Sequence, residues 1–181
     1  MASFDIFNLK IIGKGGHAAM PQTTIDPIII GTKIVDAYQS IVSRYIDPQE
    51  PVVLSVTQFH GGDAYNVIPN AIEIKGTVRC FSTKVQASIE KQMENLTSSI
   101  CSAYGATYEF EYQHRYPPTI NSAEEVETSL KVMNEISNES MINTSPSPSM
   151  GSEDFAFMLQ EKPGSYISVS YTHLRAHETS L

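Results

Sequence analysis

Apolar and polar side chains alternate in the first stretch of the chain, where the apolar positions are Phe7, Leu9 and Ile11. Alternation with a period of two is typical of a β-strand that buries one face. The strand should end at the glycine-rich run 13–16, because glycine permits a tight turn. We therefore predict a half-buried strand as the first element.

A helical period follows this strand. Asp26 is a good N-cap, and Pro27 suits the first helical position. We expect the helix to end before Asp47, because the residue before a proline avoids the helical region. Its apolar stripe recurs at spacings of three and four residues: Ile30, Ile34, Tyr38, Ile41 and Tyr45.

The same two periods predict three further strands, at 52–56, 72–78 and 108–112, and a second helix between Ser82 and Gly105. The order is strand, helix, strand, strand, helix, strand. Two right-handed crossovers on one sheet give a ferredoxin-like α+β sandwich. We therefore predict a four-stranded antiparallel sheet with both helices on one face.

This sandwich should span residues 4–117, and residues 118–170 are predicted to be an incomplete piece of an α/β catalytic domain. The elements expected there are a helix at 124–138, a Ser/Pro-rich loop at 145–149, a short helix through Phe155 capped by Gly151 or Ser152, and a strand at 166–169. They are too few to enclose a core of their own.

Composition narrows the possible partners. The 181 residues carry a net charge of -8, so nucleic acid is a poor partner. No run of 18 apolar residues exists, and no membrane span is expected. Cys80 and Cys101 form no CxxC motif and are expected to be reduced. The N-terminus does not resemble a signal peptide, which favours a cytoplasmic protein.

Three polar residues are candidates for chemistry. His17 follows a glycine turn, where a side chain can reach a ligand. Asn66 and Arg79 lie 13 positions apart (79 − 66) around the third predicted strand. An arginine can bind a carboxylate through two parallel hydrogen bonds. Taken singly, each residue favours the structural interpretation: a surface histidine, a turn asparagine and a solvated strand arginine.

Five motifs in order together resemble the lid domain and adjoining catalytic segment of the amidohydrolase metallopeptidases. That family includes hippurate hydrolase, N-acetyl-amino-acid deacetylases and plant auxin-conjugate hydrolases. The resemblance covers about residues 1–169. The motifs are Gly13–Pro21 with Asp26-Pro27, Asn66–Pro69, Gly76–Arg79, Tyr116–Asn121 and Met150–Phe155.

The resemblance implies a function. Family members hold two divalent metal ions (Zn, Mn, Co or Ni) in a catalytic domain, and their lids pair into a homodimer. The residue matching His17 helps to hold the oxyanion in the partner's active site. Those matching Asn66 and Arg79 bind the N-acyl amino acid substrate, with Arg79 on its carboxylate. A metal-bridging water attacks the amide, and a glutamate acts as general base.

The chain departs from the family at both ends. The family's metal ligands lie mainly ahead of the lid, so we expect no metal site in this chain, a start inside a longer gene, and no activity from the chain alone. Residues 171–181 resemble non-native readthrough. His173 and His177 share a helical spacing, but no third ligand follows and we reject a metal site there.

Other polar residues favour structural roles. His60 and His114 fit solvent or structural contacts. Glu153 and Asp154 suit a helix N-terminus as well as a role behind the active site. Two hypotheses remain: part of an N-acyl-amino-acid amidohydrolase, or a non-catalytic ferredoxin-like homodimerisation module. The sequence does not give the acyl group, the amino acid, the metal or the dimer edge.

Overall fold

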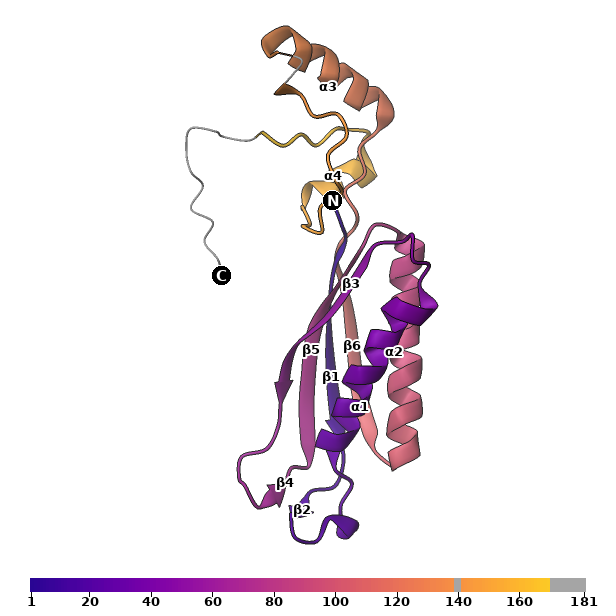
Figure 1. Ribbon diagram of the computed structural model, residues 1–181, viewed down its shortest axis with the longest axis vertical. Helices are drawn as coiled ribbons and strands as arrows, with labels where there is room; N and C mark the ends of the chain where they lie inside the picture. The colour runs from indigo at the N-terminus through magenta and orange to yellow at the C-terminus, as the bar shows by residue number, and fades with distance from the viewer. Residues whose placement is uncertain (139–140, 170–181) are drawn as a thin grey trace.

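The computed structural model describes residues 1–138 and 141–169, and a four-stranded antiparallel sheet forms its centre (Figure 1). The sheet order is β3-β5-β1-β6, and every neighbouring pair is antiparallel. The predicted four-stranded antiparallel sheet is therefore confirmed. The strands are β1 (Phe4–Ile12), β3 (Val52–His60), β5 (Ala71–Cys80) and β6 (Thr107–Tyr116).

Two helices, α1 (Pro27–Ser40) and α2 (Thr83–Tyr104), lie side by side on one face of this sheet (Figure 1). The predicted caps form: the Asp26 carboxylate accepts a hydrogen bond from the Ile28 N–H at 2.9 Å. At the other helix, Gly105 ends α2 in the left-handed conformation with φ 73°, which a residue without Cβ adopts at little cost.

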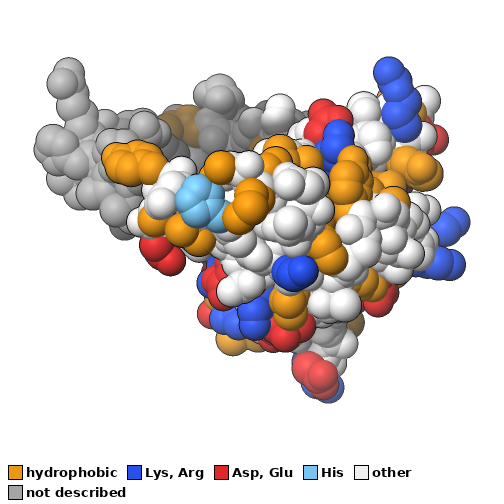
Figure 2. Space-filling model, turned by 90° about the horizontal axis from the view of Figure 1, so that it is seen from below, with side chains coloured by type: hydrophobic (Ala, Val, Ile, Leu, Met, Phe, Trp, Pro, Cys, Tyr) orange, Lys and Arg blue, Asp and Glu red, His pale blue; other side chains and the backbone are white. Residues whose placement is uncertain are grey.

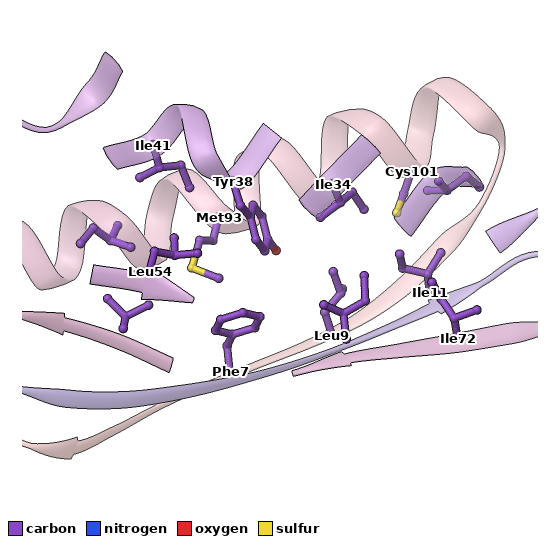
Figure 3. Close-up of a cluster of buried hydrophobic side chains, with 14 of the residues drawn as sticks. Phe7, Leu9, Ile11, Ile34, Tyr38, Ile41, Leu54, Ile72, Met93 and Cys101 are labelled. Carbon is purple, nitrogen blue, oxygen red and sulfur yellow. The ribbon is translucent and has the colours of Figure 1, made fainter. Parts of the chain in front are cut away.

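The core lies between this sheet face and the two helices. Every second residue of β1 is buried, so Phe7, Leu9 and Ile11 point toward the helices (Figure 3). Ile34 and Met93 meet them from α1 and α2. Burying an apolar side chain of this size contributes roughly 1.5–3 kcal/mol, so this shared interface holds the unit together.

A second, two-stranded sheet joins β2 (Gly16–His17) to β4 (Val67–Ile68). This small sheet has no signal in the sequence, since two-residue strands show no alternation. The short 3-10 helix η1 (Pro21–Thr23) follows β2. Beyond α1, a π-helical turn η2 (Ile41–Tyr45) ends the helical path before Asp47, as expected.

The C-terminal part contains α3 (Ala123–Ile136) and α4 (Phe155–Glu161), which confirms the two helices predicted there. No residue of α3 is buried. The predicted cap of α4 was wrong: Asp154 occupies the N-cap position. The Ser152 hydroxyl instead accepts a hydrogen bond from Arg79.

The predicted strand at 166–169 was also wrong. The Tyr166 backbone pairs with a side chain instead of a strand: its N–H donates to Asn121 Oδ1 at 2.9 Å, and its carbonyl accepts from Asn121 Nδ2 at 3.0 Å. The predicted non-native tail at 171–181, with His173 and His177, lies outside the described residues. In the part of the chain that the structure describes, no helix has the length and apolar character to cross a bilayer.

Candidate functional site

His17 lies on β2, exposed at the end of the molecule where the two-stranded sheet forms. Its Nδ1 accepts a hydrogen bond from the Ala19 backbone N–H at 3.1 Å. A nitrogen that accepts carries no proton, so in the neutral ring the proton is on Nε2. The loop therefore fixes one tautomer and presents Nε2–H as a hydrogen-bond donor.

The glycine turn before His17 is held by Asn70. The Gly15 N–H donates to Asn70 Oδ1 at 2.9 Å. A Cβ on Gly15 would lie 2.5 Å from the Ile68 carbonyl oxygen, which real Cβ atoms do not tolerate. Only glycine lets this turn approach the strand so closely, and the approach sets the position of β2.

Asn66 lies beside His17. The Ala18 N–H donates to the Asn66 carbonyl at 2.9 Å, and His17 pairs with Val67 across the two-stranded sheet. Exposed hydrophobic side chains surround this end, and Figure 2, seen from below, shows a histidine among them. They are Met20, Phe59, Tyr65 and Val67. The structure therefore brings two of the three predicted residues together.

Arg79 lies near the far end of β5, at the junction with residues 149–152. Its Nη1 donates to the Met150 carbonyl at 3.2 Å and to Ser152 Oγ at 3.1 Å. Its Cζ lies 4.6 Å from the centroid of the Phe4 ring, which is a cation–π contact. Phe4 and Ser152 were not predicted as partners of Arg79 from the sequence.

Within one chain, Arg79 is far from the other two residues. β4 leads into β5 at Ala71, and Arg79 lies eight positions further along that strand. At about 3.4 Å per residue, this separation is about 27 Å. A single copy therefore does not bring His17 and Arg79 into one cleft.

The acidic pair after this junction has structural contacts. Glu153 Oε2 accepts from the Tyr166 hydroxyl at 3.1 Å, and this bond raises the pKa of Tyr166. Asp154 caps α4 by position, without a side-chain hydrogen bond. Across residues 1–138 and 141–169, no group of three His, Cys, Asp or Glu side chains is arranged to hold a metal ion.

A buried carboxylate in the sandwich was not foreseen. Asp5 is fully buried and accepts from Gln86 Nε2 at 2.7 Å and from the Tyr112 hydroxyl at 2.9 Å. His114 lies between two carboxylates, with Nδ1 3.3 Å from Asp5 Oδ1 and Nε2 3.1 Å from Glu90 Oε2. These contacts connect β1, α2 and β6. The contacts of His114 are therefore structural ones within the sandwich.

Comparison with known proteins identifies the family. The model of peptidase family M20/M25/M40 matches residues 9–179. The chain belongs to this family. An N-acyl-L-amino acid amidohydrolase of Geobacillus stearothermophilus is 52% identical over 121 residues, which are 67% of this chain and 33% of that protein. Thermostable carboxypeptidase 1 of Saccharolobus solfataricus is 39% identical over 167 residues.

A solved M20 structure shares the fold. The Bacillus subtilis YXEP protein, described as a dinuclear metal binding peptidase, superposes with a TM-score of 0.68 at 28% identity. The match covers 91% of this chain and 39% of that one. The carboxypeptidase match likewise covers 92% of this chain and 42% of the relative. The chain thus spans about two fifths or less of these relatives.

Proposed function

We propose that this chain supplies the lid domain, residues 4–117, and adjoining catalytic-domain residues of a metal-dependent amidohydrolase that cleaves N-acyl amino acids. The order strand, helix, strand, strand, helix, strand, with sheet order β3-β5-β1-β6, supports a ferredoxin-like lid. The similarity to an N-acyl-L-amino acid amidohydrolase supports the substrate class.

The main support for this proposal is the tautomer of His17. The bond from the Ala19 N–H to Nδ1 leaves Nε2–H as a donor on an exposed loop. A fixed donor of this kind suits the oxyanion that forms when a nucleophile adds to an amide carbonyl. The neighbouring Asn66 adds an exposed amide for the substrate, and Arg79 offers a guanidinium for its carboxylate.

A homodimer through the lid is the second part of the proposal, and charge distribution favours β3 as the pairing edge. β3 and β6 are the two edges of the sheet. β3 contains no Asp, Glu, Lys or Arg, whereas β6 carries Glu109, Glu111 and Arg115. Charged side chains protect sheet edges against pairing, so the uncharged edge is the one open to a second copy.

Pairing at β3 would also explain why the candidate residues are separated in one chain. Val53, near the start of β3, pairs with Arg79 on β5. The other end of β3, at His60, runs toward the end of the molecule that holds β2 and β4. A two-fold axis makes two β3 strands antiparallel, so His17 of one copy would approach the end that carries Arg79 of the other copy.

Two divalent metal ions belong to the proposal for the whole enzyme, because the YXEP relative is described as a dinuclear metal binding peptidase. The described residues of this chain do not fit that role, since they contain no suitable ligand cluster. Their part is to hold the oxyanion through His17, to contact the substrate through Asn66 and to bind its carboxylate through Arg79.

A hybrid enzyme tests the proposal. Residues 1–169 of this chain would replace the corresponding lid domain and adjoining catalytic segment of the Geobacillus amidohydrolase, which extends beyond the 121 matched residues. Hydrolysis of N-acetyl and N-benzoyl amino acids would be measured with and without added Zn, Mn, Co or Ni. We expect metal-dependent turnover by the hybrid and none by the 181-residue chain alone. A correctly folded hybrid without turnover would contradict the assignment.

The second candidate function is a homodimerisation module without chemistry, which the uncharged β3 edge favours. The same hybrid separates the two functions. If it dimerised but Arg79→Ala weakened free-acid and ester-blocked substrates equally, the lid would contribute assembly alone. Under the enzyme hypothesis, Arg79→Ala raises KM mainly for substrates with a free carboxylate.

A further inference from the structure

We infer that Ser152 and Phe4 are positioning residues for Arg79, which leave only the Nε–Nη2 edge of its guanidinium to bind the substrate carboxylate. The inference rests on the proposed function, because it specifies how the proposed carboxylate site is built. It adds to that site a hydroxyl and a ring that come from segments outside β5.

The inference depends first on the hydrogen bonds that Arg79 Nη1 donates. A guanidinium has five N–H donors in a planar fork, two of them on Nη1. Those two face the Met150 carbonyl at 3.2 Å and Ser152 Oγ at 3.1 Å. Within the described residues, Nε and Nη2 make no hydrogen bond. A carboxylate that binds through two parallel hydrogen bonds therefore meets the Nε–Nη2 edge.

The inference depends, second, on the position of the Phe4 ring. It lies 4.6 Å from Arg79 Cζ and so restricts the plane of the guanidinium. Phe4 is itself held by an edge-to-face contact with Tyr116, with ring centroids 5.9 Å apart. Tyr116 makes a second such contact with Phe157 on α4, also at 5.9 Å. The plane of the fork is thus set by both the sheet and α4.

The loop that holds Ser152 is anchored independently of Arg79. The Ala2 N–H lies 3.0 Å from the carbonyl oxygens of Ser149 and Gly151. The loop therefore has a fixed position from which the Ser152 hydroxyl orients Nη1. Loss of that hydroxyl should leave the Met150 carbonyl as the one remaining hydrogen-bond partner of Nη1 among the described residues, and so loosen the guanidinium without moving the loop.

Five variants isolate the contacts of Arg79 with Ser152 and with Phe4. Ser152→Ala removes the hydroxyl, and Ser152→Thr keeps it. Ser147→Ala removes a hydroxyl from the same loop that, in the described residues, makes no hydrogen bond with Arg79. Phe4→Leu keeps an apolar side chain but removes the ring, and Phe4→Tyr restores the ring. Hydroxyl and ring are thereby tested separately.

The first measurement uses the 181-residue chain itself. The Arg79 side-chain nitrogens are observed by NMR with ¹⁵N-arginine, and the signals are assigned by their loss in Arg79→Lys. We expect separate Nη signals in the wild type, Ser152→Thr and Ser147→Ala, because Nη1 is held. The signals should merge in Ser152→Ala and broaden in Phe4→Leu. Identical signals in wild type and Ser152→Ala would overturn the inference.

The second measurement uses the hybrid enzyme with N-benzoyl amino acids as free acids and as methyl esters. Ser152→Ala should raise KM for the free acid about 3- to 10-fold, the effect of one hydrogen bond, and leave the ester KM and both kcat values unchanged. Equal changes for acid and ester would overturn the inference. If no hybrid hydrolysed any substrate, the proposed function would fail, and the NMR result would still decide the positioning of Arg79.

Discussion

His17 and Arg79 lie near opposite ends of the sandwich within one chain: His17 is on β2, which pairs with β4, and Arg79 is near the far end of β5, which follows β4. The separation of about 27 Å along β5 is too long for one small substrate to bridge. If both residues act on one N-acyl amino acid, they must come from different copies.

Complementation tests this consequence directly. Hybrid enzymes with His17→Ala and with Arg79→Ala would each be nearly inactive on free-acid substrates. Mixed after unfolding and refolding, they should regain about a quarter of the wild-type activity, because half of the dimers are mixed and each mixed dimer holds one intact composite site. Activity that stays at the level of the two single variants would mean that both residues serve the same copy's site.

The proposed donor role of His17 predicts a specific kinetic change. His17→Ala in the hybrid should lower kcat by roughly 10²–10³ with a small change in KM, because the oxyanion exists only as the reaction proceeds. His60→Ala is the matched control, since it removes another exposed histidine, at the end of β3. Equal losses in the two variants would remove His17 from the mechanism.

Local patterns in the sequence predicted much of the fold. The alternation of Phe7, Leu9 and Ile11 and the caps at Asp26 and Ser82 depend on neighbours along the chain, which the sequence displays. The two-residue strands β2 and β4 could not be predicted, because they are too short to show a period. The wrong strand at 166–169 has a similar cause: it is Asn121, 45 residues away, that takes its backbone hydrogen bonds.

The candidate site was predicted only as a set of residue types. The resemblance pointed to Arg79, but its partner Ser152 lies 73 positions later in the chain. No hydrophobic period connects two positions so far apart in the chain. In the sequence, Phe4 looks like an ordinary strand residue. Contacts between distant segments depend on how the sheet meets the C-terminal part, and only the structure gives that arrangement.

The uncharged edge predicts where dimer formation can be blocked. Thr57→Lys places a charge on the exposed part of β3, and Thr107→Lys makes the same change on the opposite edge, β6. We expect light scattering to give twice the chain mass of 20.0 kDa for wild type and Thr107→Lys, and the single-chain mass for Thr57→Lys. If Thr107→Lys alone dissociated the dimer, β6 would be the pairing edge.

Alkaline pH should destabilise the fold through its buried thiols. Burial raises the pKa of Cys80 and Cys101 above the ordinary thiol value of 9.0. The unfolded chain then loses its thiol protons at lower pH than the folded one. This contribution is fully present below pH 9.0 and is lost as the pH rises through the folded pKa values.

Urea unfolding at a series of pH values measures this effect. The free energy of unfolding should fall as the pH rises above 9.0, the ordinary thiol pKa, because the thiols of the unfolded chain then ionise first. The double variant Cys80→Ala/Cys101→Ala should be less stable at neutral pH but should lose stability less steeply on the alkaline side. The remaining slope would come from Tyr38 and Tyr112, whose pKa values burial also raises. Parallel curves would show that the thiols do not contribute.

A buried hydrogen bond between the two helices allows a sharper stability test. The Tyr38 hydroxyl lies 2.6 Å from Thr97 Oγ1, and both side chains are fully buried. Tyr38→Phe leaves the Thr97 hydroxyl without this partner, and Thr97→Val does the same to Tyr38. Each change should lower the free energy of unfolding by about 1–3 kcal/mol, because a buried polar group without a partner costs its full desolvation.

The double variant Tyr38→Phe/Thr97→Val distinguishes a hydrogen bond from simple packing. It removes both polar groups together, so its loss of stability should be clearly smaller than the sum of the two single losses. Urea unfolding of the four proteins at neutral pH gives the coupling free energy. Strictly additive losses would show that α1 and α2 are held by their apolar contacts and that this pair contributes nothing beyond them.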